Sequence, residues 1–96
     1  MHARITTVQG DPSQAEEAIA LVQDQVIPGT KGIQGFAGGY WLLDRATGKT
    51  LAITLWESEE AMTASEDKAA SIREQTTKQL GEDIESVERF EIVAQA

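Results

Sequence analysis

The alternation of strand-like and helix-like segments is what most constrains the fold of this chain. Short runs in which apolar or β-branched side chains recur at every second position alternate with longer stretches in which they recur every three or four residues. In chain order, these segments predict strand, helix, strand, strand, helix and strand. All six fit within the 96 residues of the sequence, so we expect residues 1–96 to form a single domain.

The first half of the chain is the more clearly patterned. An Ile-Thr-Thr-Val run predicts a strand over residues 2–8. Asp11 can then cap a helix whose first position suits Pro12. We expect Pro28-Gly29 to end this helix. Its apolar stripe consists of Ala15, Ala18, Ile19, Val22 and Val26.

The second half predicts a hairpin, a less regular helix and a last strand. The hairpin joins strands Phe36–Asp44 and Thr50–Glu57 through a polar loop with a late glycine. Ser58 can cap the second helix, Gly81 ends it, and we expect a break near Asp67. The inner stripe of this helix consists of Met62, Ser65, Ala69, Ile72, Thr76 and Leu80, and the last strand covers about Glu85–Ala94.

Two helices inserted among four strands in this order predict an α+β, ferredoxin-like βαββαβ fold, with a four-stranded antiparallel sheet and both helices on one face. The other face is then bare. If the apolar side chains at alternate positions of 51–55 meet the helices, Thr54 and Trp56 point to the bare face, together with one of the neighbours Tyr40 and Trp41. A bare face with such aromatics exceeds what monomers usually expose, so we expect a homodimer that covers it.

Composition removes several classes of function. Sixteen acidic residues against eight basic ones give a net charge of −8, a field that repels nucleic acid. There is no cysteine, which removes disulfide frameworks and thiolate metal sites, and no histidine pair for a metal. No apolar run approaches the ~20 residues that a membrane helix needs. We therefore expect a cytoplasmic protein with no metal site and no nucleic-acid or membrane partner.

Three stretches of the sequence carry a family resemblance. They are Gly35-Phe36-Ala37-Gly38-Gly39, then Leu43-Asp44-Arg45 with Thr47-Gly48, then Leu55-Trp56-Glu57-Ser58-Glu59-Glu60-Ala61-Met62. The glycines of the first stretch also allow an unusual backbone at the start of a strand, and a serine in the third caps a helix. Together with the order and length of the elements, these stretches resemble the antibiotic biosynthesis monooxygenase family over essentially the whole chain.

The resemblance implies a dimeric α/β barrel with an apolar pocket in each subunit. Some family members oxidise polycyclic aromatic substrates with molecular oxygen and no metal or flavin, so we expect no cofactor. A haem-degrading branch uses an Asn on the first strand and a Trp and a His on the second helix, which fall at about Thr7, Ser65 and Gln75. The sequence has no Asn, and its only His is His2. We therefore exclude that branch, and the missing Asn also counts against catalysis by the cofactor-free route.

Six residues are candidates for contacting a ligand. Trp56 either stacks on a flat aromatic ligand or fills the core, and we favour the core. Arg4 either holds an anion or pairs with Glu88 or Glu91, and we favour the ion pair, because an unpaired buried charge is costly. The six candidates are Arg4, Thr6, Trp41, Thr54, Trp56 and Met62.

The remaining ionisable residues are expected to lie outside any site. His2 is the only side chain that normally titrates near neutrality, but a residue beside the chain start is usually frayed. Arg73, on the second helix, is expected in solvent. We assign no catalytic residue.

Two hypotheses about function remain. The first is a small cofactor-independent monooxygenase that binds an aromatic or polyketide-like molecule in a pocket of each subunit, with Arg4 stabilising a developing anion. The second is a non-enzymatic dimer of the same fold that binds a ligand or has a structural role. Fold alone does not separate them.

Overall fold

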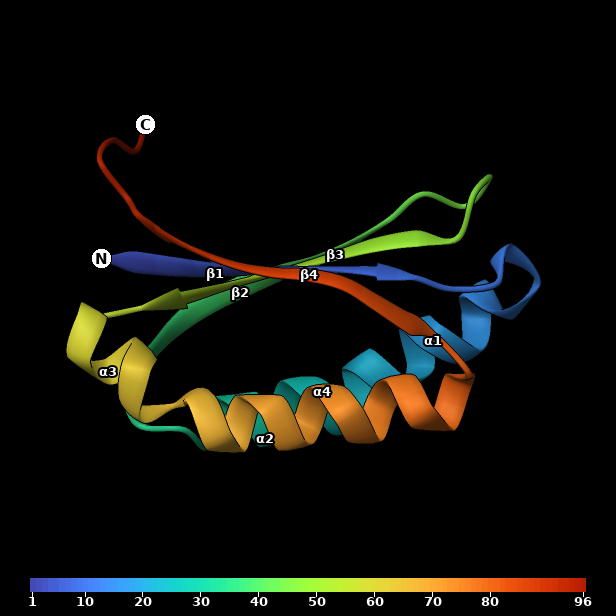
Figure 1. The fold of residues 1–96 in the computed structure, drawn as a ribbon, viewed down its shortest axis with the longest axis horizontal. Coiled ribbons are helices and arrows are strands. Elements are labelled where there is room, and N and C mark those ends of the chain that lie inside the picture. The colour runs from blue at the N-terminus through green and yellow to red at the C-terminus, as the bar shows by residue number, and fades with distance from the viewer.

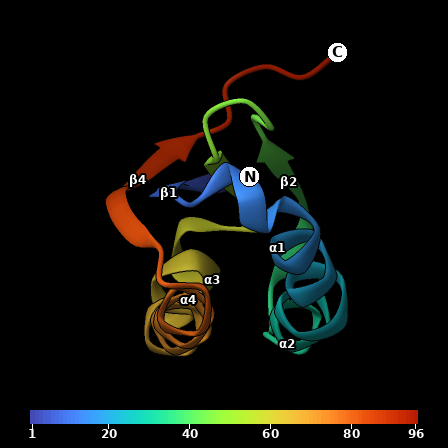
Figure 2. The ribbon, with the colours of Figure 1, turned by 90° about the vertical axis from the view of Figure 1, so that its right-hand side faces the viewer.

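A computed structural model describes all 96 residues and has the predicted architecture. Four antiparallel strands form one sheet in the order β2-β3-β1-β4, and the helices cover one of its faces (Figures 1 and 2). Each helix is too short or too polar to span a lipid bilayer. The elements are β1 (His2–Gln9), a 3₁₀ turn (Pro12–Gln14), α1 (Ala15–Leu21), a π-helical segment (Val22–Val26), α2 (Ile27–Lys31), β2 (Phe36–Leu43), β3 (Lys49–Trp56), α3 (Glu59–Ala64), α4 (Glu66–Leu80) and β4 (Asp83–Glu91).

The first helical stretch runs past the proline that was expected to end it. The N–H of Ile27 donates to the carbonyl of Val22, five residues back, which is the wider π-helical pattern. Pro28 then occupies the first turn of α2, where a missing N–H costs little. The helix therefore continues to Lys31, and the prediction that it ends at Pro28-Gly29 is wrong.

The second helical stretch breaks at Ser65, close to the predicted break near Asp67. Gly81 ends α4 in the left-handed conformation, with φ of 67°. The N–H of the next residue, Glu82, donates a hydrogen bond to the carbonyl of Thr77 at 2.8 Å, as in a Schellman motif. β4 follows at once over Asp83–Glu91, so it starts and ends earlier than the predicted Glu85–Ala94.

The two faces of β3 are assigned by its partners, and the assignment corrects one expectation. Arg4 lies opposite Thr54 on the neighbouring strand, and Trp41 lies opposite Ala52. These residues face the helices, with Thr6 and Trp56, while Tyr40 lies opposite Ile53 on the bare face. The alternate apolar side chains of 51–55 therefore do not meet the helices. Both faces of β3 carry large apolar residues, so its alternation alone could not orient it.

The buried hydrophobic core cluster lies where the first and third of the family-like stretches meet. Trp56 is fully buried and packs with Ile33 and Met62. The ring of Phe36 meets it edge to face, with centroids 5.6 Å apart. Gly35 has φ of 86°, and a Cβ on it would lie only 2.4 Å from the Cβ of Ala61. The glycine thus permits both the turn and the close approach of α3.

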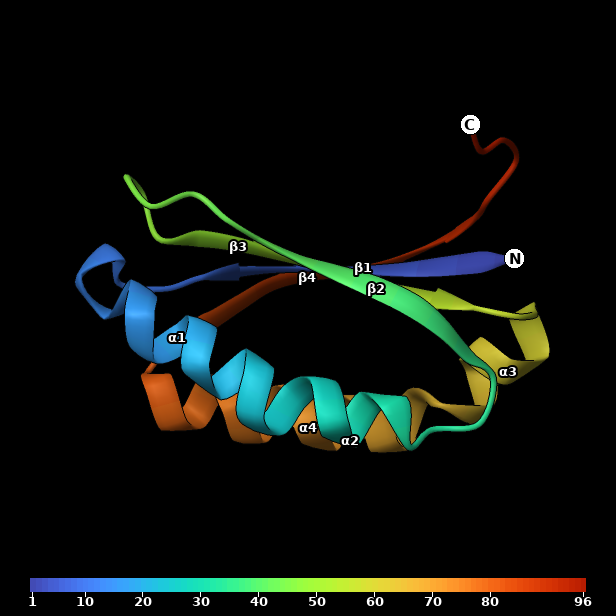
Figure 3. The same cartoon turned by 180° about the vertical axis from the view of Figure 1, so that it is seen from behind.

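The face of the sheet opposite the helices is uncovered (Figures 1 and 3). Tyr40, Leu42 and Phe90 lie on it with 64%, 46% and 47% of their surface exposed. Ile53 and Leu55 of β3 belong to the same face. We call this surface, on all four strands, the bare face.

Candidate functional site

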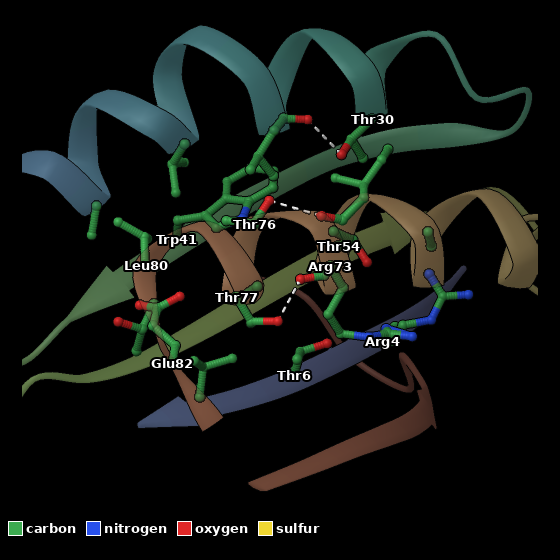
Figure 4. A pocket seen from close by; sticks show the side chains of 18 of the residues that line it. Arg4, Thr6, Thr30, Trp41, Thr54, Arg73, Thr76, Thr77, Leu80 and Glu82 are labelled. Atoms are coloured by element: carbon green, nitrogen blue, oxygen red, sulfur yellow. Dashed lines mark hydrogen bonds between the residues drawn. The ribbon is translucent and has the colours of Figure 1, made fainter. Parts of the chain in front are cut away.

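A cavity of about 100 Å³ lies between the sheet and the helices, and we call it the central cavity (Figure 4). Its walls are mainly apolar and rich in threonine. The sheet contributes Arg4, Thr6, Val8, Trp41, Thr50, Ala52, Thr54 and Trp56, and the first helical stretch contributes Ala18, Val22, Val26 and Thr30. The opposite wall consists of Ala69, Ile72, Arg73, Thr76, Thr77, Leu80 and Glu82.

Five of the six candidates chosen from the sequence line this cavity: Arg4, Thr6, Trp41, Thr54 and Trp56. Alternation along the strands brings them together on one face of the sheet. The sixth, Met62, does not line the cavity. Its side chain is buried in the core beside Trp56, and its carbonyl oxygen accepts a hydrogen bond from Arg4.

Arg4 is a buried cation that is already engaged. Its Nη2 lies 2.9 Å from the carbonyl oxygen of Met62, from Oγ of Ser65 and from Oε1 of Glu66. The predicted ion pair exists, but its partner is Glu66 rather than Glu88 or Glu91. Glu88 lies opposite Ile5 on the bare face, and Glu91 is exposed at the end of β4, opposite His2.

Glu66 joins two arginines. Arg89 on β4 donates to both carboxylate oxygens at 2.6 and 2.7 Å. Arg4, which is buried, donates to Oε1 of the same carboxylate at 2.9 Å. The hydrogen bonds from Arg89, with those from Arg4 and the charge of both, lower the pKa of Glu66 to about 2 against the desolvation that raises it. Glu66 is therefore a carboxylate throughout the physiological pH range, and it compensates the buried charge of Arg4.

The two tryptophans differ in their roles. Trp56 has no exposed surface, and its Nε1 donates to Oγ1 of Thr54 at 3.0 Å. The guanidinium carbon of Arg4 sits 5.3 Å from the Trp56 ring centroid, a cation–π distance. Trp41 is only half-buried and also borders a groove of about 430 Å³ between the first helical stretch and β2, the β2 groove. The central cavity and the β2 groove share Ala18, Val22, Trp41 and Thr50.

Arg73 corrects a prediction, because it lines the central cavity instead of lying in solvent. Figure 4 shows its side chain reaching toward Arg4. Burial and the nearby positive charge of Arg4 lower the pKa of the Arg73 guanidinium. No carboxylate pairs with it directly, since Glu66 pairs with Arg4 and Arg89. Its spacing from Ala69 and Thr76 in the predicted inner stripe could have placed it on the cavity side.

Glu82 is the second residue that the sequence interpretation missed. It is half-buried at the end of the central cavity near Leu80, away from Arg4 (Figure 4). Burial raises the pKa of its carboxyl group. The signal in the sequence was its place directly after Gly81, because a helix-ending glycine turns the following residue back toward the helix.

The positions relevant to haem binding carry no imidazole at the cavity. Thr7 lies on the bare face, so the residue of that strand that faces the cavity is Thr6. Ser65 is buried and donates to the carbonyl of Met62, and Gln75 is exposed. No three His, Cys, Asp or Glu side chains come together to form a metal site.

His2 is ordered, contrary to the expectation that it is frayed. It pairs with both neighbouring strands, opposite Trp56 and Glu91. Its Nε2 lies 3.7 Å from a carboxylate oxygen of Glu59, and only 18% of its side chain is exposed. It does not line the central cavity.

Comparisons with known proteins agree with this geometry. A family model described as antibiotic biosynthesis monooxygenase matches residues 1–75. Uncharacterized protein Rv2557 of Mycobacterium tuberculosis is 36% identical over 94 residues, which is 98% of this chain but 42% of that protein. The chain thus spans about two fifths of the length of this relative.

Solved structures agree in fold at low sequence identity. The monooxygenase from the gene ActVA-Orf6 of Streptomyces coelicolor, in complex with Nanaomycin D, has a TM-score of 0.74 at 16% identity, covering 99% of this chain and 89% of that one. The heme-degrader MhuD of Mycobacterium tuberculosis, with two hemes bound, has a TM-score of 0.73 at 18% identity, covering 100% and 99%. At these identities the similarity concerns the fold.

Proposed function

Since the chain belongs to the antibiotic biosynthesis monooxygenase family, we propose that it binds a small aromatic molecule in the central cavity and oxidises it with molecular oxygen, without a metal or flavin. The observation that carries the proposal is the unpaired, half-buried Arg73 facing an apolar cavity beside Trp41. An apolar cavity with a few fixed polar groups is the usual form of a small-molecule site.

The size of the central cavity limits the ligand. An engineered apolar cavity of about 150 Å³ takes up benzene, so a cavity of about 100 Å³ holds roughly one aromatic ring. Further rings of a polyketide-like ligand would extend past Trp41 into the adjoining β2 groove. The half-exposed face of Trp41 would then stack on the ligand at the junction.

Arg73 replaces Arg4 as the residue proposed to stabilise an anion. Arg4 is already paired with Glu66 through Nη2, and its buried Nε makes no hydrogen bond, whereas Arg73 forms no ion pair at all. An aromatic that loses a proton becomes electron-rich, and its negative oxygen can lie against Arg73. For an anthrone, the methylene carbon then loses two hydrogens and gains one atom of O₂ as a carbonyl oxygen. The second oxygen atom takes both hydrogens and leaves as water.

We also propose that the working form is a homodimer with the bare faces packed together. Tyr40, Leu42 and Phe90 leave a broad apolar surface with no cover from their own chain. A second copy related by a two-fold axis presents the same surface and buries both at once.

Oxygen uptake by the purified protein tests the oxidation. With a panel of hydroquinones and anthrones, we expect uptake above the uncatalysed rate for at least one compound. Arg73→Gln should reduce that rate by about 100-fold, the scale seen when one anion-stabilising donor is removed. Arg45→Gln, which changes an exposed arginine of the β2–β3 loop, is the matched control. Uptake at background for the whole panel would reject the oxygenase.

A second function, binding without turnover, is favoured by one observation. Arg4, the buried cation of the cavity, is already paired with Glu66, and the chain has no Asn to assist oxygen chemistry. On this alternative, Trp41→Phe changes ligand affinity and Trp56→Phe changes stability, because only Trp56 is fully buried. Native mass spectrometry that finds a retained aromatic in a protein inactive toward oxygen would support it.

A further inference from the structure

The end of the central cavity opposite Arg4 and Arg73 carries one carboxylate that has no assigned partner. Glu82 forms no ion pair and lines the cavity beside Leu80 (Figure 4). The cavity therefore has a cationic end and an anionic end, separated by apolar and threonine side chains. A ligand that satisfies both ends is acceptor-rich toward Arg73 and presents a proton donor toward Glu82.

Local backbone geometry fixes the Glu82 side chain at this place. Gly81 turns the chain through its left-handed conformation, and the N–H of Glu82 is tied to Thr77 at 2.8 Å. The carboxylate then lies against the end of β1, where a Cβ on Gly10 would come within 2.8 Å of Oε2. The absence of a side chain at Gly10 leaves the space that the carboxylate fills.

No other acid or base competes at this end of the cavity. Two charged residues lie near Glu82 in the sheet, Lys49 on β3 and Asp83 on β4. Both lie opposite Gln9 of β1, so their side chains point to the bare face. Lys78, on the last turn of α4, is exposed. Arg4 and Arg73 are the only other ionisable residues of the cavity, and burial alone shifts the pKa of Glu82 upward. A carboxylate tuned toward neutral pH by burial is suited to exchange a proton.

We propose that Glu82 is the proton acceptor of the central cavity and selects aromatic ligands with a hydroxyl group at its end. The inference rests on the proposed function and names the chemistry of the same site. The ligand O–H bond breaks, its electron pair stays on the ligand oxygen, and the proton forms a new O–H bond on the Glu82 carboxylate. The negative charge of the resulting phenolate spreads onto the ring carbons, and a para oxygen, as in a hydroquinone, accepts a hydrogen bond from Arg73.

The first test compares two single-ring probes that differ in one hydroxyl group. 4-Methoxyphenol has the proton donor, and 1,4-dimethoxybenzene lacks it. Ligand-observed NMR titrations are run with the wild-type protein, Glu82→Gln and the matched control Asp83→Asn, whose side chain is on the bare face. Between about pH 4 and pH 8 the phenol itself stays protonated, so any pH dependence reports on the protein.

The wild-type protein should bind the phenol about tenfold more tightly than the ether at the upper pH, because a charged acceptor roughly doubles the strength of a hydrogen bond. This preference should shrink as the pH falls through the pKa of Glu82. Glu82→Gln should show a small preference that does not change with pH, and Asp83→Asn should match the wild type. A Glu82→Gln protein that keeps the pH-dependent preference would overturn the assignment.

A second measurement separates this inference from the proposed function. In oxygen uptake with a hydroquinone, the wild-type rate should fall at low pH, and Glu82→Gln should lose that dependence with a rate lowered by about 100-fold or more. Uptake that is equal in wild type and Glu82→Gln would reject Glu82 while leaving the oxygenase intact. Failure of both probes to bind the folded wild-type protein would reject the ligand site and, with it, the role of Glu82.

Discussion

Single residues of this protein show how burial divides similar side chains between structure and function. Arg4 and Arg73 both face the central cavity, but Arg4 is buried whereas Arg73 is only half-buried. Arg4 is nearly fully buried and lies 2.9 Å from a carboxylate oxygen of Glu66, so Glu66 already compensates its charge. Arg73 is less buried and has no carboxylate of its own, so its charge is available to a ligand.

The arginine pairs of Glu66 lead to a prediction about stability. Glu66→Gln leaves the buried Arg4 without its counter-charge, and we expect a loss of about 3 kcal/mol in unfolding free energy at neutral pH. Urea unfolding followed by tryptophan fluorescence measures it. Glu60→Gln, an exposed change on α3, is the control and should cost little.

The pH dependence of that loss has a defined sign. The folded-state pKa of Glu66 is about 2, below the ordinary value of 4.5. A depressed carboxyl pKa stabilises the fold above the unfolded-state value, and this contribution is lost as pH falls from about 4.5 toward about 2. The gap between wild type and Glu66→Gln should therefore narrow over that interval. A gap that stays constant down to low pH would contradict the assignment.

At the scale of elements, two positions with positive φ require glycine for different reasons. Gly81 closes α4 with φ of 67°, and a Cβ there would meet no atom within 4 Å. Gly35 precedes β2 with φ of 86°, and its Cβ would meet that of Ala61 at 2.4 Å. One position needs only the backbone conformation, whereas the other also needs the space.

These glycines make a matched pair of substitutions. Gly81→Ala should cost about 1 kcal/mol, the conformational penalty alone. Gly35→Ala should cost about 2–4 kcal/mol, because α3 must also move away from β2. Chemical denaturation of both variants checks the order. Equal costs would mean that Ala61 moves freely and that the contact does not hold α3 in place.

Sequence periodicity predicts elements well where the two faces of an element differ. The apolar stripe of the first helix was predicted correctly for this reason, and two of its members, Val22 and Val26, line the central cavity. β3 has apolar side chains on both faces, with leucine and isoleucine on one and Ala52 and Trp56 beside two threonines on the other, so its orientation followed only from the strands beside it. The end of the first helix was predicted wrongly at Pro28, because a π-helical segment before this proline removes the need for its N–H. Arg73 was placed in solvent because charge was given more weight than spacing.

At the scale of the whole molecule, the two faces of the sheet have opposite roles. The face under the helices carries the polar groups of the central cavity, among them Arg4, Thr6 and Thr54. The bare face carries the exposed apolar side chains Tyr40, Leu42 and Phe90 together with Ile53 and Leu55, while Glu88, Lys49 and Asp83 lie on it nearer β4 and the strand ends. A monomer that exposes large apolar side chains on one face tends to associate through that face. The arrangement therefore favours a partner on the bare face, and each chain keeps a complete cavity.

A charge at the centre of the bare face tests this arrangement. Ile53 lies on the central strand β3, opposite Tyr40, and Ile53→Glu places a carboxylate where two copies would meet. We expect the wild-type protein to be a dimer in native mass spectrometry and sedimentation equilibrium. The variant should dissociate at least about 100-fold more readily, since an unpaired buried charge costs several kcal/mol.

The matched control is Gln79→Glu, which adds the same charge to the exposed side of α4 and should leave the dimer intact. Far-ultraviolet circular dichroism establishes that Ile53→Glu is folded, because the bare face of a monomer is open to water and tolerates a charge. The thermal midpoint should rise with concentration for the wild type and the control, but not for the folded variant. A wild-type protein that is monomeric at micromolar concentration would show that the bare face does not pair with itself.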